Sequence, residues 1–177
     1  MIVFHISKEL QKRYQTSIDV GMEISDDETG FPFENWYVRR VIVSRSEFTL
    51  FLEKERNIIV WAKGVRSENI EEVFKERFLN TVLRAGIPYR KAADLRIAEQ
   101  KCVFRKASER VWRKVSDEVI DFSESWLELS ERYIPSYRDG MIYRPNKGHF
   151  GAPKYKWPEH ELRKFFGLKP LDRSKFD

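Results

Sequence analysis

The sequence predicts an α+β fold: a mostly antiparallel sheet of about five strands with helices packed on one face, plus a basic C-terminal tail. Three observations predict it. Short β-branched and aromatic runs fill residues 35–62, apolar residues recur at helical spacing in 70–83 and 116–134, and the final region is rich in Pro, Gly and Tyr. A chain of 177 residues fits one domain, which we place at 1–135. The basic, aromatic-rich tail at 136–177 is expected to end in a short docked helix.

Strands are predicted where apolar, β-branched and aromatic residues cluster between polar turns. Turns of three polar residues separate the middle three of these runs, a spacing typical of antiparallel hairpins. The first run is followed by a short helix that Ser7 would cap. The five predicted strands are 2–6, 35–44, 48–53, 57–62 and 101–104.

Three helices are predicted from apolar spacing and end signals. Asn69 and Glu72 have the spacing of a capping box before the helix at 70–83, and a second helix follows at 88–100. The third helix, 116–134, ends before a proline, and we expect its apolar stripe to pack on the sheet. That stripe consists of Val119, Phe122, Trp126, Leu129 and Tyr133.

The net charge of +5 resides entirely in the tail, where ten basic residues face five acidic ones. A single cysteine, Cys102, excludes a disulfide framework and a multi-cysteine metal site, and its strand position favours a buried thiol. We find no cofactor motif, no metal site, no secretory signal and no apolar run of membrane-spanning length, so we expect a cytoplasmic protein without a membrane partner.

Basic residues with interleaved aromatics predict a nucleic-acid-binding protein, with RNA favoured over DNA. Single strands offer unpaired bases that stack on aromatic rings and phosphates that contact cations. One set lies around residues 104–113 and the other in the tail. The alternative for the first set is a strand-to-helix connection whose cations pair with Asp117, Glu118 or Asp121. The predicted nucleic-acid-binding residues are Lys106, Arg110, Trp112, Arg113, Arg144, Lys147, Lys154 and Lys156.

Two other functions stay open, and the sequence does not decide whether the protein is an enzyme. His149 with Lys147 and Arg144 would suit a small metal-independent ribonuclease of toxin or defence type, with a base and two cations. An ordinary basic loop is the alternative interpretation of these three residues. His5, on the first strand, is a further candidate base or else a core histidine.

An acidic stripe on the helix 116–134 predicts a third function, binding of a protein partner. Its members recur at spacings of three and four, which places them on one helix face. The ordinary interpretation is a solvated face, and the basic tail is another possible occupant. The stripe consists of Asp121, Glu124, Glu128 and Glu131.

Three segments resemble, in this order, parts of a bacterial family of domains of unknown function. The segments are "NWYVRRVIV", "FTLFLEKERNIIVWAKGV" and "FRKASERVWRKVSDEVIDF". The family has a W-Y strand, a Leu-Phe strand turn and a late F-x-K-x-x-x-R-x-V segment. Phe104, Lys106 and Arg110 match that segment, and Val111 comes one position before its Val. Ala107 replaces a Thr of that pattern, and its Gly is missing near Lys114. The resemblance covers about residues 1–130 and implies a compact α+β domain but no activity.

Overall fold

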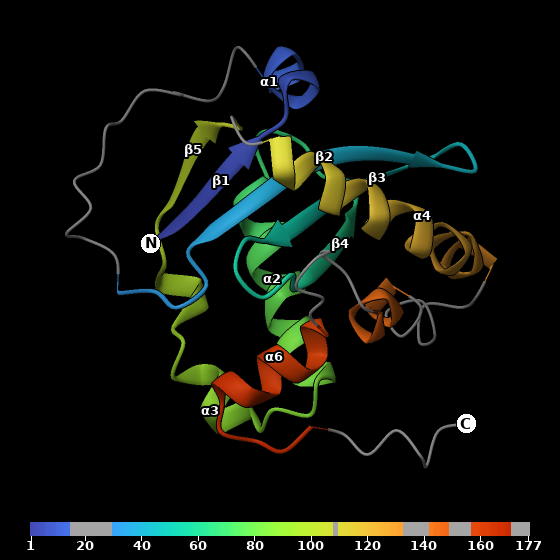
Figure 1. Cartoon of the computed structure of the whole chain (residues 1–177). Helices are drawn as coiled ribbons and strands as arrows, with labels where there is room; N and C mark the ends of the chain where they lie inside the picture. The colour runs from blue at the N-terminus through green and yellow to red at the C-terminus, as the bar shows by residue number, and fades with distance from the viewer. Residues whose placement is uncertain (15–29, 108–109, 133–141, 149–156, 171–177) are drawn as a thin grey trace.

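The computed structural model describes residues 1–14, 30–107, 110–132, 142–148 and 157–170 (Figure 1). Its five strands form one sheet in the order β4-β3-β2-β1-β5. The strands are β1 (Ile2–Ile6), β2 (Asn35–Val43), β3 (Ser46–Glu53), β4 (Ile59–Lys63) and β5 (Cys102–Lys106). The helices are α1 (Lys8–Tyr14), α2 (Ile70–Arg84), α3 (Tyr89–Ala93), η2 (Ile97–Glu99), α4 (Arg110–Arg132), η3 (Arg144–Lys147) and α6 (Pro158–Phe165).

The sheet is mixed. Strands β2, β3 and β4 form the expected antiparallel meander, which contains the longest strands. Strand β1 lies between β2 and β5 and is parallel to both. Four of its five side chains are buried, a pattern typical of a central parallel strand. The predicted α+β class and five strands are therefore confirmed, with a larger parallel part than expected.

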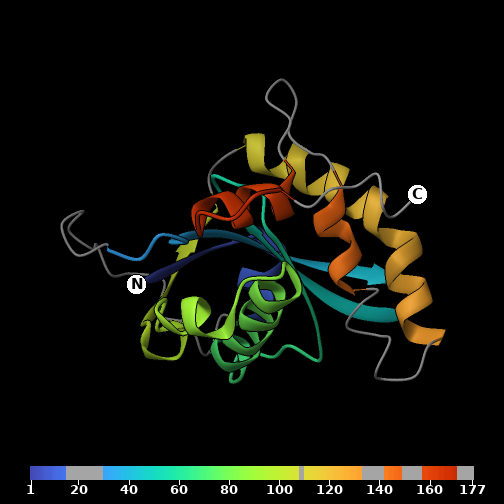
Figure 2. The same ribbon diagram turned by 90° about the horizontal axis from the view of Figure 1, so that it is seen from below.

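Helices cover both faces of the sheet, so the prediction of helices on one face is wrong. Phe74 of α2 packs against Trp36 on one face. Val119 of α4 belongs to a second cluster with Leu50 on the other face. Figure 2 shows the sheet between these two helices. The cause is visible in β3, where residues 48–53 are all buried, because side chains on both of its faces meet a helix.

Helix α4 is rotated about its axis relative to the prediction. Phe122 is 44% exposed, and Trp126 and Leu129 are half-buried. The side that faces the sheet instead carries small serines beside its apolar residues, and Ser123 and Ser130 each donate a hydrogen bond to the helix's own backbone. A serine satisfied in this way can lie against apolar neighbours without leaving a polar atom unpaired. The buried residues of α4 are Val115, Ser116, Val119, Ser123, Leu127 and Ser130.

Helix ends follow the sequence signals in part. Ser7 Oγ accepts a hydrogen bond from Leu10 N at 3.5 Å, as expected of a cap. Asn69 makes no side-chain cap; its Oδ1 accepts from Arg66 N at 2.7 Å and closes the preceding turn. The expected helix at 88–100 divides into α3 and η2, because Arg96 between them adopts a left-handed conformation.

The described parts of the tail pack on the domain. Asn146 of η3 is 1% exposed, and Leu162 of α6 belongs to the core cluster on the α2 face. Phe166, just after α6, is half-buried, whereas Phe165 is 40% exposed. A free basic tail is not seen in these parts, and the domain boundary at residue 135 stays a prediction.

Candidate nucleic-acid interface

The carboxyl ends of β1 and β5 form a topological switch point. The strands are parallel neighbours, and Ile6 pairs with Lys106 near their ends. Helix α1 follows β1 onto the α2 face of the sheet, whereas α4 follows β5 onto the opposite face. Figure 1 shows both arrowheads pointing toward α1 and the start of α4. In open α/β sheets, ligands bind outside the carboxyl ends of strands at such a point, and we call the surface at the ends of β1 and β5 the crevice.

The elements around this crevice carry five exposed cations. Lys8 and Lys12 belong to α1, Lys106 ends β5, and Arg113 and Lys114 lie near the start of α4. Within the described part of the chain, none of them makes an ion pair. Their charges are therefore available to an anionic ligand.

Two described acidic residues that lie close to these cations in the sequence, Glu9 and Asp117, are paired with arginines. Arg40 binds Glu9 at 3.0 Å and Glu47 at 2.9 Å, and Arg39 binds Asp117. The hydrogen bond from Arg40 lowers the pKa of Glu47, which keeps that carboxylate ionised. Because these carboxylates are matched by arginines, they do little to offset the five exposed cations.

A row of polar side chains crosses the sheet on the α4 face, next to the crevice. Arg105, His5 and Tyr37 pair across β5, β1 and β2, so the three side chains share one face. His5 Nε2 lies 2.9 Å from Asn35 Oδ1, and the side chains of His5 and Arg105 are half-buried. Burial raises the pKa of Tyr37, while nearby guanidinium groups, that of Arg113 among them, oppose this shift. The row offers an imidazole and a guanidinium to a ligand in the crevice.

Residues 3–161 match the family described as a domain of unknown function, DUF6933. The chain belongs to this family. The match confirms the resemblance to an uncharacterised family and extends beyond residue 130 through η3 into α6. No curated protein and no solved structure matches the chain.

The DUF6933 domain brings part of the predicted nucleic-acid set to the crevice. Lys106 and Arg113 are exposed there. Arg110 and Trp112 belong to the first turn of α4, although their side chains lie outside the described residues. The alternative interpretation, pairing of these cations with the acidic residues of α4, is not observed at Asp117, which binds Arg39.

The described members of the tail set, Arg144 and Lys147, lie at the opposite edge of the sheet. Residue Asn146 of η3 binds β4, whereas Lys106 ends β5, and four strand spacings of about 4.8 Å separate these edges by roughly 19 Å. Arg144 is exposed and lies over the ring of Trp126, 5.3 Å from its centre. Lys147 of η3 is half-buried. Three members of the predicted sets lie outside the described residues: His149, Lys154 and Lys156.

The ribonuclease set of Arg144, Lys147 and His149 thus stays a prediction.

The four residues of the acidic stripe on α4 have two different environments in the structure. Asp121 and Glu124 are exposed. Glu128 instead accepts a hydrogen bond from Ser44, and Glu131 pairs with Lys63, so these two tie α4 to the sheet.

Other chemistry finds little support in the described residues. They contain no cluster of His, Cys, Asp and Glu that could hold a metal ion. Burial raises the pKa of Cys102 to about 12, so its thiol is a poor nucleophile near neutral pH. In this part of the chain, no helix combines the length and the apolar character needed to cross a membrane.

Sequence reasoning missed Lys8, Lys12 and Arg105, as well as Lys114 beside the predicted Arg113. Their place at the crevice depends on the pairing of β1 with β5, which are about a hundred residues apart in the chain. The uninterrupted apolar run at 2–4 was the available signal, because it is typical of a strand with neighbours on both sides.

Proposed function

We propose that this DUF6933 domain binds single-stranded RNA at the carboxyl ends of β1 and β5. The observation that carries the proposal is the set of five exposed cations on α1, β5 and α4, none of which is paired with a described acid. Cations spread over three elements suit the successive phosphates of a polyanion better than a single small anion. Phe104 on β5, which is half-buried, would supply a stacking surface, which favours RNA single strands over duplex DNA.

The test is fluorescence anisotropy with a labelled single-stranded RNA oligonucleotide over a series of salt concentrations. The variant K106A/R113A/K114A should bind more weakly. The slope of log affinity against log salt should shrink by about 0.7 for each phosphate that the variant no longer neutralises. A DNA oligonucleotide of the same sequence, used as competitor, compares the two nucleic acids.

Two further variants serve as controls. R90A/K164A/K169A removes the same charge from exposed positions that do not border the crevice, and it should retain the salt slope. R144A/K147A probes the cations at the β4 edge. Reductions in proportion to the charge removed in all three variants, three cations in two of them and two in R144A/K147A, would show that only net charge matters. An unchanged slope in the first variant would refute the interface.

A second candidate function is metal-independent cleavage of the bound RNA, favoured by the placement of His5 beside Arg105. The imidazole of His5 would take the proton of a ribose 2′-hydroxyl while that oxygen attacks the adjacent phosphorus. The P–O5′ bond breaks, the 5′-oxygen takes a proton from water, and the guanidinium of Arg105 stabilises the added negative charge on the phosphate. Incubation of RNA with the protein in chelator tests this: cleavage abolished in His5→Gln, with binding retained, supports the candidate.

The same assay with His149→Ala tests the tail set. RNA that stays intact with the unmodified protein leaves binding alone as the function.

A further inference from the structure

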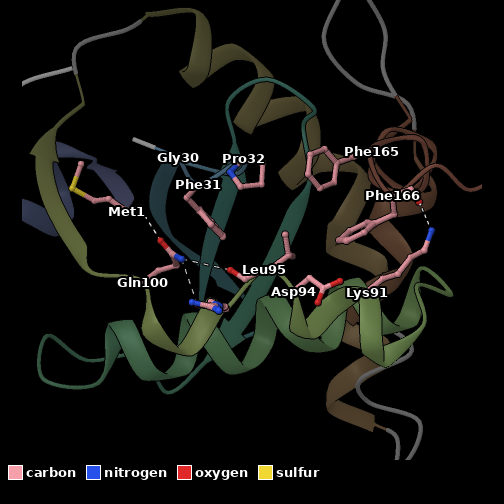
Figure 3. A pocket seen from close by; sticks show the side chains of 11 residues that line it. Met1, Gly30, Phe31, Pro32, Lys91, Asp94, Leu95, Gln100, Phe165 and Phe166 are labelled. Atoms are coloured by element: carbon pink, nitrogen blue, oxygen red, sulfur yellow. Dashed lines mark hydrogen bonds between the residues drawn. The ribbon is translucent and has the colours of Figure 1, made fainter. Parts of the chain in front are cut away.

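A pocket of about 690 Å³ opens at the other end of the parallel strands, at their amino ends (Figure 3). Its volume lies within the range of roughly 300–1,000 Å³ typical of small-molecule sites. The segment before β2, the end of α6 and the connection from α3 to β5 line it. It is thus separate from the crevice at the carboxyl ends.

Aromatic rings form the apolar walls of the pocket. Phe31, Phe165 and Phe166 line it. Phe165 is 40% exposed, yet its ring packs edge-on against Phe33, with 4.7 Å between the ring centres. The guanidinium carbon of Arg56 lies 5.4 Å from the centre of the Phe165 ring. An exposed ring that is held by its neighbours is suited to stack with a flat ligand.

Two opposite charges face the pocket from α3 and its C-terminal end. Lys91 and Asp94 are three positions apart, so they lie on one side of the helix, and Figure 3 shows both side chains at the pocket. Lys91 Nζ donates to the carbonyl of Phe166 at 2.8 Å, which joins α3 to the end of α6. The carboxylate of Asp94 is exposed and makes no ion pair or side-chain hydrogen bond with the described residues.

The pocket is connected to the crevice by the exposed edge of the sheet. Gln100 lines the pocket, and β5 begins two residues later. Every residue of β5 is half-buried or exposed, and basic side chains lie at both of its ends, from Lys101 to Arg105 and Lys106. Six residues of extended chain span about 20 Å. A single strand that lies along β5 would therefore meet cations at both ends of the strand.

We propose that this pocket binds a guanine base of the RNA strand, an inference that rests on the proposed function for the strand itself. The exposed ring of Phe165 would contact one face of the base, while Phe31, which is 6% exposed, forms part of the pocket wall. A carboxylate accepts two neighbouring N–H donors, and guanine presents such a pair in N1–H and the 2-amino group, so Asp94 would bind this edge. Lys91 would donate to the O6 acceptor. Adenine, cytosine and uracil lack this combination.

Calorimetric titration with mononucleotides tests the pocket without the rest of the strand. The probes are guanosine, inosine, adenosine and uridine 5′-monophosphates; inosine retains N1–H and O6 but lacks the 2-amino group. We expect the guanosine nucleotide to bind roughly tenfold or more tightly than the adenosine and uridine nucleotides, with inosine between them.

Three variants separate the contributions. Asp94→Asn should remove the preference for guanosine, whereas Asp121→Asn, at an exposed carboxylate on α4, should retain it. Phe165→Leu should weaken all nucleotides alike and leave their order unchanged. Circular dichroism of each variant verifies the fold. Equal affinities for the four nucleotides, or a guanosine preference that persists in Asp94→Asn, would overturn the inference.

The two proposals fail separately. If a uridine oligonucleotide binds in a salt-sensitive manner but the guanosine nucleotide shows no saturable binding, guanine binding in the pocket is refuted and RNA binding at the crevice is supported. Saturable, Asp94-dependent binding of the guanosine nucleotide without binding of any oligonucleotide refutes the strand and supports a mononucleotide site.

Discussion

The side-chain amide of Asn146 binds both backbone groups of Ile59. Its Oδ1 accepts from Ile59 N at 2.9 Å, and its Nδ2 donates to Ile59 O at 2.7 Å. Ile59 begins β4, the edge strand of the sheet on this side. The amide thus satisfies one donor and one acceptor that an edge strand otherwise exposes to other chains. A residue of the predicted tail thereby completes the sheet.

Asn146→Ala should destabilise the protein by about 2–4 kcal/mol, because two buried backbone groups lose their partners. Asn69→Ala is the matched control: Asn69 also binds two backbone groups, Arg66 N and Gly64 O, but at an exposed turn. We expect the control to cost less than about 1 kcal/mol. Urea unfolding curves measure both. Equal destabilisation would mean that burial of the Asn146 hydrogen bonds adds nothing.

The location of α4 was predictable, but its orientation was not. The apolar stripe through Phe122 and Trp126 gave a clear helical pattern, and a helix forms there, although it begins at Arg110, six residues before the predicted start. Its inward side contains serines, which a hydrophobicity pattern assigns to solvent. Ser123 reaches the core because its hydroxyl bonds to Val119 O within the helix. The small serines let α4 approach the sheet closely, and this determines which side of the helix packs on the sheet. A pattern of polar and apolar residues does not contain that information.

Ser123→Leu should therefore destabilise the protein more than Phe122→Ser. Ser123 is fully buried, so a larger side chain must displace its neighbours, which costs about 1–3 kcal/mol. Phe122 is 44% exposed, and its replacement removes a smaller buried area. Thermal unfolding followed by circular dichroism compares the two. Greater destabilisation by Phe122→Ser would place the apolar stripe, and not the serines, against the sheet.

The candidate site was predictable only as a set of residue types. The basic segment around Lys106 and Arg113 was visible in the sequence, but the sheet order that places it beside α1 depends on long-range pairing. The same strand order places this basic segment and Arg144 at opposite edges of the sheet. Residue spacing does not reveal strand order, so the sequence combined two sets of cations that the fold places at opposite edges.

Two glutamates of β3 should give opposite dependences of stability on pH. Arg40 lowers the folded-state pKa of Glu47, so the stabilisation from Glu47 is present above its unfolded-state pKa and is lost as the pH falls through the folded value. Burial raises the folded-state pKa of Glu53, although its hydrogen bonds to the backbone N–H groups of Arg56 and Glu55 oppose the shift. Its contribution is therefore greatest at low pH and is lost as the pH rises through the folded value.

Urea unfolding of Glu47→Gln and Glu53→Gln between about pH 4 and pH 7 tests this contrast. The stability difference between wild type and Glu47→Gln should shrink on acidification. The difference between wild type and Glu53→Gln should move in favour of the wild type. Parallel pH profiles for the two variants would contradict the assigned environments.

Cys102 should be unreactive in the native protein and reactive after unfolding. Its thiol is half-buried on β5, and burial raises its pKa to about 12, so only a very small fraction is thiolate at pH 8. A thiol-specific chromogenic reagent at pH 8 should therefore label the native protein far more slowly than the protein in denaturant. The experiment also tests how firmly β5 is held in the sheet. All residues of this edge strand are half-buried or exposed, and frequent detachment of the strand would expose the thiol. Native labelling as fast as in denaturant would show that β5 leaves the sheet often. The RNA strand that we propose to lie along β5 would then have no fixed surface to bind.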